Sequence, residues 1–223
     1  MTAHPSFLEV RDVHKHYGAI RAVDGVSLSV APGEIVGVIG PNGSGKTTLF
    51  NSILGQIRPT SGAVEFCGED ITGTSPLELA RRGIGRTFQT LQVFGKLSVR
   101  DNLIVAAQEF KGSLGARLFA APDAGLGHRA DEMIDLFRLA HVAHLPAGSL
   151  SYGQQKLIDI AMSFMAMPRL VLLDEPCAGV NPGLVDGLRE LLVTLNRTQG
   201  GSFVVIEHNM DFIMKLCPHV ICM

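Results

Sequence analysis

Residues 40–47 constrain the fold of this chain more than any other segment. They read Gly-Pro-Asn-Gly-Ser-Gly-Lys-Thr, which fits the phosphate-loop pattern of two spaced glycines followed by lysine and then serine or threonine. An apolar run at 35–39 precedes them as a buried strand, and residues 48–54 can form a helix. A strand, a glycine-rich loop and a helix, in this order, provide the context that the motif needs. The sequence therefore predicts a site for a nucleoside triphosphate.

The chemistry of this loop depends on its backbone and on two side chains. Glycines permit backbone angles that let successive N–H groups surround a polyphosphate, and the following helix adds a partial positive charge at its N-terminus. Lys46 is expected to reach the terminal phosphates, and the Thr47 hydroxyl to take one position on Mg²⁺. The alternative, a glycine-rich turn with an unrelated lysine, does not explain the flanking strand and helix. The residues expected to contact the nucleotide here are Gly40, Pro41, Asn42, Gly43, Ser44, Gly45, Lys46, Thr47 and Thr48.

Composition limits the remaining possibilities. The 223 residues can form one domain, and a formal net charge of −2 gives no overall attraction to nucleic acid or anionic lipid. No apolar stretch approaches the roughly 20 residues that span a bilayer, and the N-terminus does not resemble a signal peptide. The four cysteines lack the spacing of a metal site, so we expect reduced thiols and a cytosolic chain.

Periodicity divides the chain into a strand-rich first third and a helical middle. Alternating apolar residues predict strands at 7–13 and 26–30, and a short strand follows at 63–66. Helices are expected at 76–86 and across most of 98–165, where Ser98 followed by Asp101 indicates a capped start for the run Val99 to Phe110. Beyond them we expect, in order, a strand at 170–173, a helix at 183–198, a strand at 202–206, a helix at 209–216 and a last strand from 220.

One of the later strands ends in two carboxylates that suit nucleotide chemistry. Ligands of open α/β sheets lie at the carboxyl ends of the strands. The run at 170–173 leads to Asp174, which suits a second contact to Mg²⁺, and then to Glu175. Because neighbouring residues in an extended chain point in opposite directions, Glu175 is left to orient or deprotonate an attacking water. The alternative is a pair of acidic residues that only solvate the end of a strand.

Three further positions are candidates on spacing alone. The strand at 202–206 leads to His208, which could contact the terminal phosphate or the attacking water, although a lone histidine is more often structural. Gln89 could hold Mg²⁺ or water, or be an ordinary surface residue. Residues 151–154 begin a helix and could bind an anion, or form an ordinary N-cap.

In combination these residues resemble the ATP-binding-cassette ATPases over essentially the whole chain. Residues 40–47 match the family's phosphate loop, Gln89 its glutamine loop, and 150–154 the signature sequence that separates the family from other phosphate-loop proteins. The remaining matches are the second nucleotide motif with its catalytic glutamate at 170–175, the switch histidine at His208, and at Tyr17 the aromatic residue that stacks on adenine.

The resemblance implies a fold and an activity. The fold would be α/β: a RecA-like phosphate-loop NTPase core with a mostly parallel sheet, an N-terminal antiparallel β subdomain and an inserted α-helical subdomain. The activity would be hydrolysis of ATP with Mg²⁺. The catalytic residues would be Glu175, His208 and Gln89, and the metal would be held by Thr47, Gln89 and Asp174.

The resemblance also implies partners and boundaries. Two such domains pair head to tail, as a homodimer or a heterodimer, so Ser151, Gly153 and Gln154 would contact the ATP bound by the partner. The whole chain would be a single domain of 1–223, whose nucleotide-binding core comprises 1–89 and 166–223 and whose helical insert comprises 90–165. The chain stops at Met223 without a polar tail, and we expect a C-terminal segment to be missing.

A finer resemblance is to the ATPase subunits of branched-chain amino acid importers. It is carried by residues 85–89, 97–103, 150–154 and 178–182. Tyr152 stands where glycine is usual in the wider family, and Asn181 where aspartate is common. We therefore expect a transport motor bound peripherally to the cytoplasmic face of the plasma (inner) membrane through permease subunits. Segment 90–100, with Phe94 and Leu97, is expected near the groove that receives them, buried packing being the alternative.

Two other functions remain as alternatives. The same group has close relatives that import urea and short amides, and substrate specificity resides in other subunits. A soluble cassette ATPase that acts on DNA or ribosomes is the second alternative. The chain lacks the long coiled-coil insertion or second cassette of those proteins, and no basic stripe indicates a nucleic-acid partner.

Overall fold

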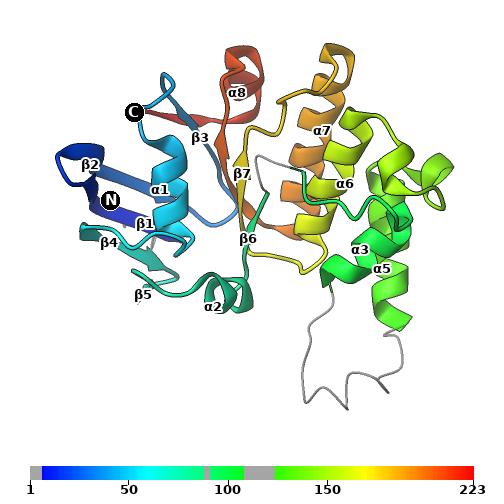
Figure 1. Cartoon of the computed structure of the whole chain (residues 1–223), viewed down its shortest axis with the longest axis horizontal. Coiled ribbons are helices and arrows are strands. Elements are labelled where there is room, and N and C mark those ends of the chain that lie inside the picture. The colour runs from blue at the N-terminus through cyan, green and yellow to red at the C-terminus, as the bar shows by residue number, and fades with distance from the viewer. Residues whose placement is uncertain (1–6, 88–90, 108–123) are drawn as a thin grey trace.

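The structure is a computed structural model that describes residues 7–87, 91–107 and 124–223. Within them the chain forms two β-sheets, with helices arranged around the second (Figure 1). The strands are β1 (Leu8–Tyr17), β2 (Ile20–Val30), β3 (Ile35–Ile39), β4 (Ser61–Phe66), β5 (Glu69–Asp70), β6 (Ile84–Arg86), β7 (Leu170–Asp174), β8 (Ser202–Ile206) and β9 (His219–Cys222). The helices are α1 (Lys46–Ile53), α2 (Pro76–Arg81), α3 (Val99–Ala107), α5 (Ala124–Leu136), α6 (Tyr152–Phe164), α7 (Pro182–Gln199) and α8 (Met210–Leu216), with short 3-10 helices at Ala140–Val142 and Ala147–Ser149.

The larger sheet is parallel and has the strand order β6-β7-β8-β3-β9 in the described residues. Every residue of β7 and of β8 is buried, which explains why both strands read as continuous apolar runs rather than as alternating ones. Because the strands are parallel, the carboxyl ends of β7, β8 and β3 meet at one edge of the sheet. The three strands that were expected to end in site residues are therefore neighbours.

The smaller sheet is antiparallel, with the order β2-β1-β4-β5. Its pairing is irregular near the middle of β1, where the register shifts against both neighbours. Asp12 lies in this irregularity with a φ of 44°, a left-handed conformation that aspartate tolerates better than most residues. Gly62 of β4 approaches the same point so closely that a Cβ atom there would lie 2.3 Å from the carbonyl oxygen of Asp12.

The two faces of the parallel sheet pack against different parts of the chain. One face forms a core with α1 and the antiparallel sheet, and the other forms a core with α3, α5, α6, α7 and α8 (Figure 1). Alternate strand residues divide between the cores, because successive side chains of a strand point to opposite faces. The first face contributes Val36, Val38, Leu170, Leu172, Val204 and Ile206, and the second Ile35, Val171, Leu173, Phe203 and Val205.

A buried asparagine shapes the loop that leads into α3. The Asn102 amide donates hydrogen bonds to the carbonyl oxygens of Phe94, Leu97 and Ser98, and its own oxygen accepts one from the Phe94 N–H. Ser98 caps the helix as expected, since its hydroxyl accepts from the Asp101 N–H at 3.0 Å. The loop therefore holds a defined shape while the Phe94 side chain remains exposed.

The α/β class and most of the expected elements are confirmed, but one helix was predicted too long. Residues 76–86 were expected to be helical, whereas α2 ends at Arg81 and residues 84–86 form strand β6. Gly83 has a φ of 89° and ends the helical run, after which Ile84 pairs with Leu170 of β7. Strands β1 and β2 also extend beyond the predicted 7–13 and 26–30, meeting in a tight turn after Tyr17.

The four cysteines all lie within the described residues, and each is a free thiol. Burial raises the pKa of the Cys217 thiol to about 12, so that it behaves as a small apolar side chain. None of the helices that the structure describes has the length and apolarity to cross a bilayer.

The close approach at Gly62 can be tested by substitution with alanine. Gly62 and Gly68 have φ angles of 90° and 81°, but a Cβ atom at Gly68 would meet nothing within 4 Å. Both alanine variants should lose roughly 1–2 kcal/mol to left-handed strain. Gly62→Ala should lose about 1–3 kcal/mol more, because the backbone of Asp12 and Val13 would have to move. Denaturant unfolding measures the difference, and equal losses would contradict the steric argument.

Candidate functional site

The phosphate loop joins β3 to α1 at the carboxyl edge of the parallel sheet. Gly45 is the N-cap of α1, with a φ of 95° and no side-chain cap, so the first-turn N–H groups remain open to an anion. A Cβ atom at Gly45 would lie 2.0 Å from the carbonyl oxygen of Ala22, which explains the glycine at this position. At Gly40 a Cβ atom would come within 2.7 Å of the Ser44 hydroxyl.

Lys46 lies across this loop rather than in solvent. Its side chain is buried, and its ammonium donates hydrogen bonds to the carbonyl oxygens of Gly40 at 2.8 Å and Pro41 at 2.9 Å. Thr47, the next residue, is exposed on the first turn of α1. The loop therefore presents a cation and a set of N–H groups to the same space, which is the arrangement required to bind an anion.

Asp174 ends β7 with a carboxylate that the protein satisfies only in part. The residue is 1% exposed, and its Oδ2 atom has no hydrogen-bond partner among the described residues. The guanidinium of Arg86 lies 3.8 Å from that oxygen. Burial raises the pKa of Asp174, and the charge of Arg86 opposes the rise. A buried oxygen without a hydrogen bond is costly, and carboxylate oxygen is a ligand that Mg²⁺ prefers, so the position fits that metal.

Glu175 and His208 meet across the ends of β7 and β8. Nε2 of His208 lies 3.1 Å from Oε1 of Glu175, and the Glu175 side chain is about a quarter exposed (24%). Glu175 has a φ of 49°, which turns its side chain away from the direction that a continuing strand would give. The pair borders an open hollow of about 400 Å³. A carboxylate held by an imidazole beside open space has the geometry of a general base and the group that orients it.

Glu207 is a site residue that the sequence motifs did not indicate. Its carboxylate is almost fully buried. One oxygen accepts a hydrogen bond from the Cys177 N–H at 2.6 Å, and the other accepts from the N–H groups of His208 at 2.8 Å and Asn209 at 3.1 Å. Glu207 therefore connects the loop after β7 to the loop that carries His208. These hydrogen bonds fix the backbone position of His208 relative to Glu175.

The segment 150–154 lies in a different part of the molecule. Ser151 and Gln154 form a reciprocal capping box at the start of α6, so this helix has an ordinary N-cap. Helix α6 packs on the face of the parallel sheet opposite to α1 (Figure 1). Gly153 follows within the first turn and is buried, whereas Ser151 is exposed.

The two departures from the expected pattern both have a structural account. The ring of Tyr152 lies over Gly179, where a Cβ atom would be only 2.4 Å from the ring. Asn181 is the N-cap of α7, and its side-chain oxygen accepts from the Gly183 N–H at 2.9 Å. Tyr152 and Gly179 thus connect the start of α6 to the loop after β7.

The remaining predicted site residues are Tyr17 and Gln89. Tyr17 is half exposed at the end of β1, and the ammonium of Lys15 lies 5.0 Å from the centre of its ring. Gln89 lies outside the described residues. The structure brings the phosphate loop, Asp174, Glu175 and His208 to one edge, whereas 151–154 lie on α6.

Sequence comparison relates the chain to membrane transport proteins. The ABC transporter family matches residues 23–178. The chain is 36% identical over 220 residues to the high-affinity branched-chain amino acid transport ATP-binding protein BraF of Pseudomonas aeruginosa, an alignment that covers 96% of this chain and 86% of that protein.

Solved structures give the same relationship. An ATP-binding cassette of an ABC transporter in its ADP conformation superposes with a TM-score of 0.87 at 35% identity, covering 99% of this chain and 88% of that one. A dimeric ATP-binding cassette in a post-hydrolysis state, bound to ADP and phosphate, superposes with a TM-score of 0.82 at 26% identity, covering 97% and 94%.

Replacement of Glu207 tests its positioning role. Glu207→Gln keeps the shape of the side chain but turns an NH₂ group toward at least one of the three N–H donors. We expect the free energy of unfolding to fall by roughly 1–3 kcal/mol, the cost of leaving a buried donor unsatisfied. Glu190→Gln, which changes an exposed carboxylate on α7, should stay within about 0.5 kcal/mol of the parent in the same denaturant titration. Equal stability of the two variants would remove the positioning role.

Proposed function

The chain belongs to the ABC transporter family, and from this premise we propose that it is the ATP-hydrolysing subunit of an importer for branched-chain amino acids. The observation that carries the proposal is the contact of 3.1 Å between His208 and Glu175 at the edge where the phosphate loop also lies. The similarity to the Pseudomonas aeruginosa protein supports the amino acid substrate.

ATP would bind with its phosphates in the loop of residues 40–48. The open N–H groups at the start of α1 would receive the phosphate oxygens, since the Gly45 cap leaves them without a side-chain partner. Lys46 would exchange its two carbonyl partners for the terminal phosphates. Tyr17, half exposed on β1, is the residue proposed to stack on adenine.

Mg²⁺ would be held between the loop and the end of β7. Thr47 offers a hydroxyl, Asp174 offers the buried oxygen that has no hydrogen-bond partner in the described residues, and Gln89 is the third proposed ligand. The ion would supply charge neutralisation on the phosphate oxygens. Arg86, beside the same oxygen of Asp174, would orient that carboxylate.

Hydrolysis would use the pair at the strand ends. Water attacks the terminal phosphorus, its proton passes to the Glu175 carboxylate, and ADP leaves. His208 would donate from Nε2 to Glu175 and hold the carboxylate in place, while Glu207 fixes the His208 backbone. The catalytic residues proposed are therefore Glu175 and His208. Gln89 is proposed as a third, which would form a hydrogen bond with the attacking water.

The remaining part of the site would come from a second subunit. Ser151, Gly153 and Gln154 start α6, whereas the phosphate loop starts α1 on the opposite face of the parallel sheet. The signature segment of one subunit would therefore serve the nucleotide of another, in a homodimer or a heterodimer. The dimeric cassette bound to ADP and phosphate supports this assembly.

Coupling to permease subunits would pass through the helical part of the chain. The loop before α3 exposes Phe94 while Asn102 fixes its backbone, so an apolar side chain is presented on a defined support. Leu97 is half-buried in the same loop. We place the insert boundaries at 90 and 165, and the permease contact would hold the subunit at the cytoplasmic face of the membrane.

Glu175→Gln separates binding from chemistry. The amide cannot accept the proton of water, so ATP hydrolysis should fall roughly 10²–10⁴-fold. Binding of ATP should persist and give a lasting dimer, because the phosphate loop is unchanged. Phosphate release and size-exclusion chromatography measure the two effects.

Two further variants complete the comparison. Lys46→Ala should weaken ATP binding itself. Glu132→Gln, on the exposed face of α5, should change neither ATP binding nor hydrolysis. Normal turnover by Glu175→Gln would remove Glu175 as the base.

Uptake by cells that lack this subunit tests the transport function. Leucine uptake should be lost and urea uptake retained, because the proposal assigns the subunit to a branched-chain amino acid importer. The parent chain should restore uptake, and so should Met214→Ala, which removes an exposed side chain from α8. The double variant Phe94→Ala/Leu97→Ala should not restore it, although its ATPase activity in isolation persists. Restored uptake by that variant would refute the docking role, and loss of urea uptake alone would refute the substrate.

A further inference from the structure

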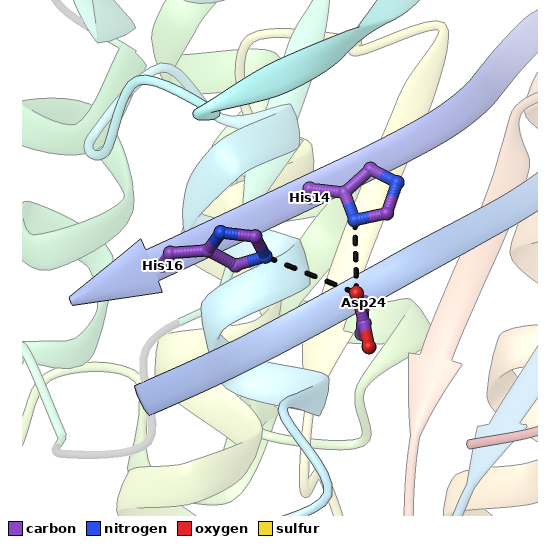
Figure 2. Close-up of side chains that lie close together, drawn as sticks. All are labelled: His14, His16 and Asp24. Carbon is purple, nitrogen blue, oxygen red and sulfur yellow. Dashed lines mark hydrogen bonds and ion pairs between the residues drawn. The ribbon is translucent and has the colours of Figure 1, made fainter. Parts of the chain in front are cut away.

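A group of two histidines and one aspartate lies on the antiparallel sheet. His14 and His16 are two residues apart on β1, so their side chains leave the same face of the strand. Asp24 comes from the neighbouring strand β2, and both imidazole rings are directed toward its carboxylate (Figure 2). We call these three residues the His-Asp cluster. None of them has a role in the nucleotide chemistry described above.

The distances within the His-Asp cluster suit a bound cation. Nδ1 of His14 lies 3.0 Å from Oδ1 of Asp24, and Nε2 of His16 lies 3.8 Å from the same oxygen. One ligand atom from each residue can be chosen so that all three lie within 4.8 Å of one another. Tetrahedral zinc, with bonds of about 2.0–2.2 Å, places its ligand atoms roughly 3.3 Å apart. Small side-chain rotations would therefore bring all three atoms onto one ion.

The histidine that lies farther from Asp24 has an unmet bonding requirement. Nε2 of His16 is buried and has no hydrogen-bond partner among the described residues. A buried polar atom without a partner is destabilising, and a lone pair on an imidazole nitrogen is a good metal ligand. An ion at the His-Asp cluster would satisfy this atom without moving the backbone of β1.

The surrounding residues resemble the outer contacts of a metal site. The carboxylate of Asp12 lies 3.1 Å from Nε2 of His14, which would fix the ring and leave Nδ1 to face the ion. Arg21 donates to Oδ2 of Asp24 at 3.2 Å, which leaves Oδ1 for a single bond to the ion. Gly25 makes room for this arrangement, since a Cβ atom there would lie 3.2 Å from Asp12 and 3.3 Å from the His14 ring.

We propose that His14, His16 and Asp24 form a binding site for a divalent cation of the zinc class. Two imidazoles and one carboxylate favour zinc over Mg²⁺ or Ca²⁺, which prefer oxygen ligands throughout. Asp24 is half exposed, so a fourth position is open to water. The ion would connect β1 to β2, and one of its ligands, His16, directly precedes Tyr17.

Zinc titration of the full chain, without nucleotide and free of any histidine tag, tests the site. Isothermal titration calorimetry should detect one zinc ion per chain. Asp24→Asn removes a ligand charge, and His16→Gln removes a ligand nitrogen, so each should weaken zinc binding about tenfold or more. Asp12→Asn keeps a residue that tolerates the left-handed φ, and it should weaken binding roughly 10–100-fold as an outer contact.

The matched control is a histidine–carboxylate pair elsewhere on the surface. Nε2 of His128 lies 3.3 Å from Oε1 of Glu132 on α5, and His128→Gln should leave zinc binding unchanged. Circular dichroism shows whether each variant is folded. If His16→Gln does not fold, Asp12→Asn takes its place in the zinc titration. Absence of zinc binding by the parent chain, or equal affinity in Asp24→Asn and His128→Gln, would show that the cluster is only an ion-pair network. Cobalt substitution gives a second readout, because a thiolate charge-transfer band would assign the metal to cysteine instead.

Discussion

The parallel pairing of β8 with both of its neighbours is the constraint on which the site depends. Ile206 pairs with Asp174 of β7 on one side and with Val38 of β3 on the other, so the three strands end together. The residues that end or follow each strand therefore lie at the carboxyl edge of the parallel sheet. A shift of one residue in either pairing would separate the phosphate loop, Asp174 and His208, and would also exchange the side chains that the strand gives to the two cores.

Contacts beyond the strands refine this placement. Glu207 joins the loops that follow β7 and β8, and Arg86 extends from β6 to the buried carboxylate of Asp174. Tyr152 covers Gly179 and so links α6 to the loop after β7. A movement of α6 would therefore displace the loops that border Glu175. The displacement would pass through direct packing of Tyr152 on Gly179 rather than through a long chain of residues.

The sequence predicted those features that depend on neighbouring residues. The phosphate loop, the apolar runs of β7 and β8 and the Ser98 cap are local patterns, and all three were recognised. Strand β6 was mistaken for the end of a helix, because its identity comes from pairing with residues more than 80 positions away. The role of Glu207 was missed for a similar reason: its partners include a backbone N–H group on another loop. The His-Asp cluster depends on the irregular register between β1 and β2, which no periodicity reveals.

The hydrogen bonds of Lys46 to its own loop have a consequence for ligand discrimination. Because the ammonium already has two carbonyl partners, an incoming anion must compete with an internal ligand of the protein. A single phosphate group offers few contacts with which to displace them, whereas a polyphosphate also engages the N–H groups along the loop and at the start of α1. The loop would therefore favour a polyphosphate over a small single anion, because a ligand must offer enough contacts to replace these internal hydrogen bonds.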